Sequence, residues 1–435
     1  MIKGDVFFKN KRAGFIQKNQ DQSYTFTYLN GSPVVSMTLK NMEEPHHSDE
    51  LFPFFDGLIP EGWLLNLVQK NWKIAKDDRM TLLLSACQDC IGATHILPHN
   101  QIPLTPISHP QYMSTKNKFE MDRCLICMQD LLEEPLYHKK CANDLFGFEH
   151  ISFVDVSTEK LEELALLQIN QRLTLTGVQK KLSLAPESDK NSNRLTVVGL
   201  DGRFILKPST EEYKEMSANE HLCMKLAELL GLNVAKCGLV QLTNGELAYV
   251  TKRFDRLQNE KIMMEDFCQL SLKPTSKKYS GSTESLGKVI EEYSDFPQDD
   301  KLTLFQFVLY SFIIGNADMH LKNFSLWQEP RSRHFRMSPG YDFLSTRLLI
   351  SSKDDPEEMA LTINGKKNKL KWKDFLELGK NLNLPEKVMK KFRDSMVNAY
   401  PTVEIMVYRS FLSEKKQMEF LTLMKSRLSK LITED

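Results

Sequence analysis

The sequence lacks several features that would place it in common classes of protein. It contains neither a G-x-x-x-x-G-K-[ST] loop nor a G-x-G-x-x-G fingerprint, which argues against a P-loop NTPase and a dinucleotide-binding enzyme. Its longest apolar run, near residues 305–314, is too short to span a membrane and is typical of a buried helix. Basic and acidic residues number 57 each, so we expect neither direct DNA binding nor membrane association.

The chain carries no recognisable secretion signal. It begins MIKGDVFF, with no long apolar stretch behind a basic start, so we expect a cytoplasmic protein. In that compartment its 8 cysteines are expected to be thiols or metal ligands and not disulfides. A hydrophobic share of 41% among 435 residues is enough to bury the cores of more than one domain.

Turn signals and composition divide the chain into four parts. The first mixes short β-like runs with a helix near residues 63–68, and Asn30-Gly31 predicts a hairpin between residues 25–29 and 34–39. Four prolines between residues 97 and 110 indicate a linker. A small cysteine and histidine module comes next, and then a mixed β/α lobe and a helical lobe. The parts are residues 1–105, 106–150, 151–268 and 269–435.

Within the last two parts, the pattern predicts two hairpins and a series of helices. Asp201-Gly202 predicts a hairpin that joins residues 195–200 to residues 203–207. Asn244-Gly245 predicts a second hairpin, and Gly231 is placed to end a helix. The second hairpin is expected to join residues 234–242 to residues 247–252. Helices are expected at residues 161–167, 214–230, 302–314, 373–380, 386–396 and 414–431.

The sharpest candidate for chemistry is a polar loop over residues 315–324. Asp318 and Asn323 lie in this loop, and Asp342 follows after a predicted hairpin. Phosphoryl transfer needs a carboxylate near the attacking hydroxyl and oxygen ligands for Mg²⁺, and this set supplies both. The alternative for such a loop, taken alone, is that its polar side chains only cap turns.

Two upstream residues strengthen this interpretation. Lys207 ends a β-like run, and Glu220 lies in the helix that follows. In kinases a strand lysine binds the α- and β-phosphates and pairs with a helix glutamate. A lone strand lysine is usually solvated. The order of the whole set nevertheless matches a kinase from lobe to lobe: Lys207, Glu220, Asp318, Asn323 and Asp342.

Residues 175–184 are the candidate phosphate loop. A single glycine, Gly177, stands between β-like flanks, where backbone N–H groups can approach a phosphate. The alternative is an ordinary hairpin turn.

Taken together, these segments resemble the HipA family of serine/threonine kinases, the toxins of bacterial toxin–antitoxin modules. The matching segments run in order through nearly the whole chain: residues 57–63, 89–93, 176–183, 204–208, 219–220, 253–256, 265–269, 315–323 and 341–342. The resemblance implies an α+β, bilobal protein-kinase-like fold of the phosphoinositide-kinase-like branch. It also implies an added amino-terminal β-rich subdomain.

The resemblance assigns roles to the candidate site residues. Lys207 would contact the phosphates of ATP, and Asp318 would be the catalytic base. Asn323 and Asp342 would bind Mg²⁺. Other residues would complete the nucleotide site. The phosphate loop would contribute Gly177, Val178, Gln179 and Lys181, and Glu265 and Phe267 would belong to the hinge near the adenine. Glu220 would pair with Lys207, and His320 would lie in the polar loop.

Regulation, partners and substrate are implied in the same way. The family switches itself off by phosphorylating a serine of the phosphate loop, and the matching positions here are Thr174 and Thr176. The substrate class would be an aminoacyl-tRNA synthetase, and the partner would be a HipB-like DNA-binding antitoxin. The alternatives are a small-molecule phosphotransferase, since antibiotic kinases share the D-x-H-x-x-N loop, and a non-catalytic pseudokinase partner of the antitoxin.

A separate motif predicts a metal site. Cys124-x-x-Cys127 is followed by His138-x-x-Cys141. Two ligand pairs about ten residues apart suit tetrahedral Zn²⁺, and the role would be structural because protein fills all four positions. The alternative is a group of buried thiols in a small subdomain.

Overall fold

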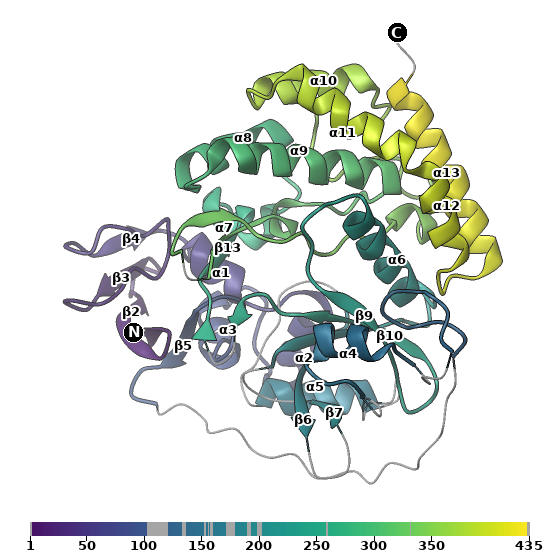
Figure 1. The fold of residues 1–435 in the computed structure, drawn as a ribbon. Helices are drawn as coiled ribbons and strands as arrows, with labels where there is room; N and C mark the ends of the chain where they lie inside the picture. Colours follow the sequence, from purple (N-terminus) through teal and green to yellow (C-terminus); the bar gives the residue numbers. More distant parts are fainter. Residues whose placement is uncertain are drawn as a thin grey trace.

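The computed structural model describes most of the chain as an amino-terminal domain, a β-rich lobe and a helical lobe (Figure 1). Within the described residues, we find no helix with the length and apolarity that a membrane crossing requires. The described residues are 2–101, 121–132, 136–151, 154, 156, 160–170, 179–188, 193–197, 202–257, 260–330 and 332–432.

The amino-terminal domain is built on a five-stranded antiparallel sheet in the order β4-β3-β2-β1-β5. Three helices, α1, α2 and α3, lie between β4 and β5 in the chain, and α2 contains the helix expected near residues 63–68. The bounds are β1 (Ile2–Phe8), β2 (Lys11–Lys18), β3 (Tyr24–Tyr28), β4 (His46–Ser48), α1 (Pro53–Leu58), α2 (Gly62–Trp72), α3 (Arg79–Ala86) and β5 (Thr94–Pro98).

The hairpin predicted around Asn30-Gly31 is wrong. Strand β3 pairs with β2 and β4, and residues 34–39 form no strand. The backbone of this segment bonds to a side chain instead: Val35 N–H donates to Tyr28 Oη across 3.1 Å, and Tyr28 Oη donates to the Leu39 carbonyl oxygen across 2.7 Å. These bonds satisfy the backbone groups that a strand partner would otherwise satisfy.

The β-rich lobe has a second five-stranded sheet in the order β7-β6-β8-β10-β9. Helix α6 packs on this sheet and ends just before Gly231, whose φ of +79° suits a helix C-terminus. The β9–β10 hairpin is confirmed. The bounds are α5 (Leu161–Asn170), β6 (Leu182–Ser188), β7 (Asn193–Val197), β8 (Phe204–Pro208), α6 (Met216–Leu229), β9 (Cys237–Gln241) and β10 (Leu247–Lys252).

The hairpin predicted around Asp201-Gly202 is wrong, because β6 lies between β7 and β8. In this register Leu184 of β6 faces Phe204 of β8, and Leu182 faces Leu206. All four side chains are buried. Apolar burial between β6 and β8 therefore outweighs the local turn signal.

The helical lobe is centred on α9, whose side chains are buried on most faces, as the apolar run predicts. The helix ends at Gly315, with φ of +71°, and so delivers the polar loop that follows. The remaining helices are α7 (Phe267–Leu270), α8 (Thr283–Tyr293), α9 (Pro297–Ile314), α10 (Trp372–Asn381), α11 (Glu386–Asn398), α12 (Tyr400–Tyr408) and α13 (Glu414–Ile432), with short 3-10 turns η2 (Thr275–Lys277), η3 (Leu321–Asn323) and η4 (Thr346–Leu348).

Two small sheets and one helix complete the described fold. Strands β13, β14 and β15 form an antiparallel sheet that positions the segments before and after the polar loop. Helix α4 belongs to the cysteine and histidine module. The bounds are α4 (Lys139–Phe146), β11 (Arg256–Leu257), β12 (Glu260–Lys261), β13 (Met264–Asp266), β14 (Ser325–Gln328) and β15 (Phe335–Met337).

Candidate active site

The structure brings Lys207 of β8 together with Glu220 of α6 and with Asp342. Lys207 Nζ lies 2.6 Å from Glu220 Oε1, and it also forms an ion pair with Asp342 Oδ1. Lys207 and Glu220 are buried, whereas the Asp342 side chain is 34% exposed. The sequence prediction that these three side chains converge therefore agrees with the structure.

Charge and burial act in opposite directions on these groups. Burial alone would lower the pKa of Lys207, but the carboxylates of Asp342 and Glu220 outweigh it and raise that pKa above its usual value. Burial raises the pKa of Glu220 to about 7, and the negative charge of Asp342 adds to this rise, which Lys207 only partly offsets. Burial also opposes ionisation of Asp342, but Lys207 and Lys181 outweigh it and lower the Asp342 pKa. The partly exposed Asp342 is therefore the carboxylate available to a cation.

Asp342 also has an unusual backbone. Its φ of +57° lies in the left-handed region, which few residues other than glycine adopt. Asn316 Nδ2 donates to the Asp342 carbonyl oxygen across 3.3 Å and helps to hold this conformation. Strained backbone of this kind is often found at functional sites.

The polar loop is organised by hydrogen bonds around Asp318. Asn323 Nδ2 donates to the Asp318 carbonyl oxygen across 2.9 Å, and Asp318 N–H donates to Asn316 Oδ1 across 3.1 Å. The Asp318 carboxylate accepts from Tyr279 Oη at 2.5 Å. The His320 ring packs edge-on against Tyr279, with centroids 4.9 Å apart. The loop is therefore preorganised, and Tyr279 occupies one carboxylate oxygen of Asp318.

A pocket between the two lobes is lined by four of these groups, Lys207, His320, Asn323 and Asp342. Asp318 does not line it and lies beside Tyr279 instead. The amino-terminal domain contributes part of the wall. The lining includes Lys181, Lys207, Phe254, His320, Asn323, Tyr341 and Asp342 from the two lobes, and Gly57, Leu58, Glu61 and Ile91 from the amino-terminal domain.

The candidate phosphate loop is described only in part. Lys181 is buried and lines the pocket, and burial, with a contribution from the charge of Lys207, lowers its pKa to about 8. Gln179 Nε2 is buried without a hydrogen-bond partner in the described part of the chain. The other residues named for this loop lie outside the described residues: Thr174, Thr176, Gly177 and Val178.

The predicted hinge residues, Glu265 and Phe267, do not line the pocket. Glu265 Oε1 accepts from the Met37 N–H across 2.6 Å, and Glu265 Oε2 accepts from Ser36 Oγ across 2.8 Å. Burial raises the pKa of Glu265 to about 7. The neighbours that do line the pocket are Met264 and Asp266, as strand alternation requires.

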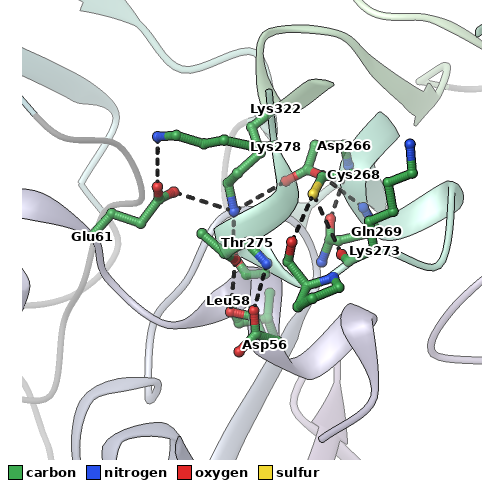
Figure 2. Close-up of polar contacts among 12 residues, drawn as sticks. Asp56, Leu58, Glu61, Asp266, Cys268, Gln269, Lys273, Thr275, Lys278 and Lys322 are labelled. Carbon is green, nitrogen blue, oxygen red and sulfur yellow. Dashed lines mark hydrogen bonds and ion pairs between the residues drawn. The ribbon is translucent and has the colours of Figure 1, made fainter. Parts of the chain in front are cut away.

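A buried ion network that no sequence pattern predicted joins the amino-terminal domain to the polar loop (Figure 2). Glu61 Oε2 accepts from Lys278 Nζ across 2.8 Å, and Glu61 Oε1 lies 3.4 Å from Lys322 Nζ. Lys322 Nζ donates to the Gly57 carbonyl oxygen across 3.0 Å and lies 3.4 Å from Asp266 Oδ2. Burial would raise the pKa of Glu61, but the two lysines outweigh it and lower that pKa to about 2.

A second buried network fixes the amino-terminal domain beside the pocket. Asp89 Oδ1 accepts from Arg256 Nη2 across 2.9 Å and from Lys261 Nζ across 2.5 Å. The N–H of Gly92 donates to Asp255 Oδ2 across 2.9 Å. The segments 89–93 and 253–256, which were matched separately in the sequence, are therefore in direct contact.

The cysteine and histidine motif forms a compact cluster. One potential ligand atom from each of Cys124, Cys127, His138 and Cys141 lies within 4.8 Å of the other three. His138 Nε2 lies 3.0 Å from the Asp130 carbonyl oxygen and must donate to it, which leaves Nδ1 as the free nitrogen on the side of the thiols. This is the arrangement that orients a histidine for metal binding.

Two family models match separate parts of the chain. The family model described as the HipA-like C-terminal domain matches residues 173–403, and the model described as the HipA N-terminal domain matches residues 4–97.

Several known proteins are similar in sequence. A candidate kinase of Haemophilus influenzae is 27% identical over 305 residues, which cover 64% of this chain and 85% of the relative. The candidate kinase Y4mE of Sinorhizobium fredii is 28% identical over 385 residues, which cover 85% of this chain and 82% of the relative. The serine/threonine-protein kinase toxin HipA of Shewanella oneidensis is 29% identical over 213 residues, which cover 44% of this chain and 47% of the relative.

A solved structure shows the same fold. The HipA chain in the Shewanella oneidensis complex of HipA, HipB and operator DNA aligns with a TM-score of 0.68 and 17% sequence identity, covering 99% of this chain and 97% of that one. The alignment extends over the whole molecule, so the expected bilobal α+β fold with an added amino-terminal β-rich domain is confirmed.

Proposed function

The chain belongs to the HipA family, and from this premise we propose that it is a serine/threonine protein kinase that transfers the γ-phosphate of ATP to a protein. The observation that supports this most is the position of Lys207, buried between Glu220 and Asp342 at the wall of a pocket. A lysine paired with a helix glutamate, next to a carboxylate that can hold a metal ion, is the arrangement that phosphotransfer uses.

The side chains in the pocket fit ATP with Mg²⁺. Lys207 and Lys181 supply positive charge for phosphates, and the lowered pKa of Asp342 keeps it ionised for a cation. Asn323 Nδ2 is engaged by the Asp318 carbonyl, which leaves the Asn323 amide oxygen for the same cation. Bound Mg²⁺ would neutralise the charge that develops on the transferred phosphoryl group.

Asp318 is the proposed general base. Its carboxylate now accepts a hydrogen bond from the Tyr279 hydroxyl, which is the bond that a serine or threonine hydroxyl of a substrate would make. In the proposed reaction Tyr279 moves aside and the substrate hydroxyl donates to Asp318. Asp318 takes the proton as the hydroxyl oxygen bonds to the γ-phosphorus, while the bond from that phosphorus to the oxygen bridging to the β-phosphate breaks and ADP leaves.

A phosphotransfer assay tests the proposed activity. Purified protein is incubated with γ-labelled ATP, Mg²⁺ and host lysate, and labelled proteins are counted for wild type, Asp318→Asn and Asp342→Asn. We expect either substitution to lower the rate by about 10²- to 10⁴-fold. Asp394→Asn, an exposed change on α11, is the control. Equal labelling by wild type and both active-site variants would exclude the proposed chemistry.

We propose an aminoacyl-tRNA synthetase as the substrate and a HipB-like DNA-binding antitoxin as a partner, which places the protein in the cytoplasm. The support for the partner is the fold shared with a HipA chain in a complex that contains HipB and operator DNA. Phosphoproteomics after induction checks the substrate. A small-molecule phosphotransferase would produce no newly phosphorylated protein. Co-purification with the product of an adjacent gene checks the partner.

Regulation by autophosphorylation at Thr174 or Thr176 is a further part of the proposal. A phosphate there would add a charge of about −1.5 to −2 where the phosphates of ATP must lie. Intact-mass measurement after incubation with ATP checks it. An unchanged mass, under conditions in which the protein phosphorylates a substrate, would rule it out.

We propose that the cluster of Cys124, Cys127, His138 and Cys141 binds one structural Zn²⁺. Three thiols and an imidazole are a ligand set that zinc prefers, and His138 is already oriented by the Asp130 carbonyl. Metal analysis of freshly purified protein checks it, with Cys127→Ser as the variant that should lose the metal. Folded wild-type protein that contains no zinc would refute it.

A further inference from the structure

Two successive residues of α6 contact two parts of the candidate active site. Asn219 Nδ2 donates to the Ser345 carbonyl oxygen, and Asn219 Oδ1 accepts from the Ser345 N–H, each across 2.9 Å. The next residue, Glu220, pairs with Lys207. All four residues are buried. The position of α6 therefore sets the positions of both the lysine and the segment that follows Asp342.

The third residue in this row, His221, joins α6 to the cysteine and histidine cluster. His221 Nε2 lies 3.0 Å from the carbonyl oxygen of Ile126, and because a carbonyl only accepts, Nε2 must donate. Ile126 stands between Cys124 and Cys127 in the first ligand pair. His221 is fully buried, and its Nδ1 has no hydrogen-bond partner in the described structure. The bond to Ile126 is therefore the polar contact that fixes this ring.

The module that carries the cluster is itself held from both lobes. In the β-rich lobe, the Leu239 N–H of β9 donates to the Leu125 carbonyl oxygen across 2.8 Å. In the helical lobe, Arg409 Nε donates to the Met128 carbonyl oxygen across 3.1 Å, and Arg409 pairs with Asp130 at 2.6 Å. Helix α6 contacts α12 beside the same module (Figure 1). The cluster thus lies where α6 and both lobes meet.

We infer that the metal ion of this cluster positions Glu220 for phosphotransfer, by holding the turn whose Ile126 carbonyl accepts from His221. The inference rests on the proposed zinc site and the proposed kinase activity. Ligation of Cys124 and Cys127 fixes the turn between them, and so fixes the carbonyl that anchors α6 one residue away from Glu220. Without the metal, the turn is no longer held by the ligation of Cys124 and Cys127, and α6 loses a fixed hydrogen-bond acceptor for His221. His221 is in this sense a positioning residue that acts through Glu220.

Substitutions at His221 separate positioning from simple packing. Leucine fills a similar volume but cannot donate, whereas glutamine places an amide N–H near the position of Nε2. We expect both variants to retain one zinc ion per chain. His221→Leu should exchange the amide hydrogens of α6 roughly tenfold faster and lower kcat for phosphotransfer roughly tenfold, as loss of one buried hydrogen bond implies. His221→Gln should keep the amide exchange of α6 and kcat close to their wild-type values. Asp144→Ala, an exposed change on α4, should alter neither quantity.

Metal removal gives a second measurement on wild-type protein, independent of whether a variant folds. After chelation and removal of the chelator, we expect faster exchange in α6 and slower phosphotransfer with Mg²⁺ present, and added Zn²⁺ should restore both. Unchanged α6 exchange in zinc-free protein or in His221→Leu would overturn the inference, as would wild-type protein that never binds zinc. If zinc binds but ATP is not turned over, the kinase proposal fails, while α6 exchange still decides whether the metal positions the helix.

Discussion

Lys322 Nζ donates to the carbonyl oxygen of Gly57 across 3.0 Å, which ties the residue next to Asn323 directly to the amino-terminal domain. Glu61 and Asp266 lie within 3.4 Å of the same ammonium group. Lys322 is buried, so these contacts replace its hydration. The geometry of the polar loop and the docking of the amino-terminal domain are therefore coupled.

The first prediction concerns Glu61. Glu61→Ala leaves Lys278 and Lys322 in a buried interface without their shared carboxylate, and removing one partner of a buried pair typically costs about 3–5 kcal/mol. We expect a loss of this order in the free energy of unfolding, measured with urea, and a lower rate of phosphotransfer. Glu50→Ala, an exposed change in the same domain, should leave the unfolding midpoint unchanged. A midpoint for Glu61→Ala equal to that of wild type would contradict the prediction.

The second prediction is the pH dependence of the same contact. The pKa of Glu61 is lowered to about 2 in the folded protein, from an ordinary value of 4.5. A lowered acid pKa stabilises the fold fully above pH 4.5, and this contribution is lost as pH falls through 2. The free energy of unfolding should therefore differ most between wild type and Glu61→Gln above pH 4.5, and converge below it. A difference that stays constant from pH 7 to pH 3 would show that Glu61 is not ionised in this way.

The convergence of Lys207, Glu220 and Asp342 could be predicted because each residue lies beside a local element that the sequence makes clear. Lys207 ends an apolar strand, Glu220 lies in a helix that stops at Gly231, and Asp342 follows a hairpin. Local signals of this kind determine which elements form. Their order in the chain then matched one known arrangement of the elements.

The remaining features depend on contacts between residues far apart in the sequence. The pairing of β6 with β8 is decided by the apolar side chains that they bury together, and the Asp201-Gly202 turn signal contains no information about it. The pair of Glu61 and Lys322 likewise joins two domains, and neither residue is unusual in its own segment. Such contacts could be found only after the domains were placed against each other.

The third prediction concerns the close approach of Gly57 to Gln269. A Cβ added at Gly57 would lie 2.6 Å from Gln269 Cγ. Gln269 cannot easily move, because its Nε2 donates to the Phe54 carbonyl oxygen across 2.8 Å and its Oε1 accepts from the Asp266 N–H. We expect Gly57→Ala to lower the free energy of unfolding by about 1–3 kcal/mol through overpacking.

A double-mutant cycle checks the cause of that effect. Gln269→Ala removes the side chain that Gly57→Ala would meet, so the double variant should lose less stability than the sum of the two single variants. Strictly additive losses would mean that the added methyl group is accommodated without contact to Gln269.

The last prediction follows from the lowered pKa of Lys181, which lines the pocket and is affected by the charges of Lys207, Asp342, Glu61 and Glu220. Burial and then the charge of Lys207 lower this pKa to about 8, from 10.5, so the free enzyme loses the charge of Lys181 as pH rises through 8. If Lys181 binds the phosphates of ATP, kcat/KM for ATP should fall above pH 8, since this ratio reports groups of the free enzyme. Lys181→Arg should remove the fall, because a guanidinium group stays charged. For Lys181→Met, kcat/KM for ATP should be low at both pH 7 and pH 9. Coinciding profiles for wild type and Lys181→Arg would show that another group causes the pH dependence.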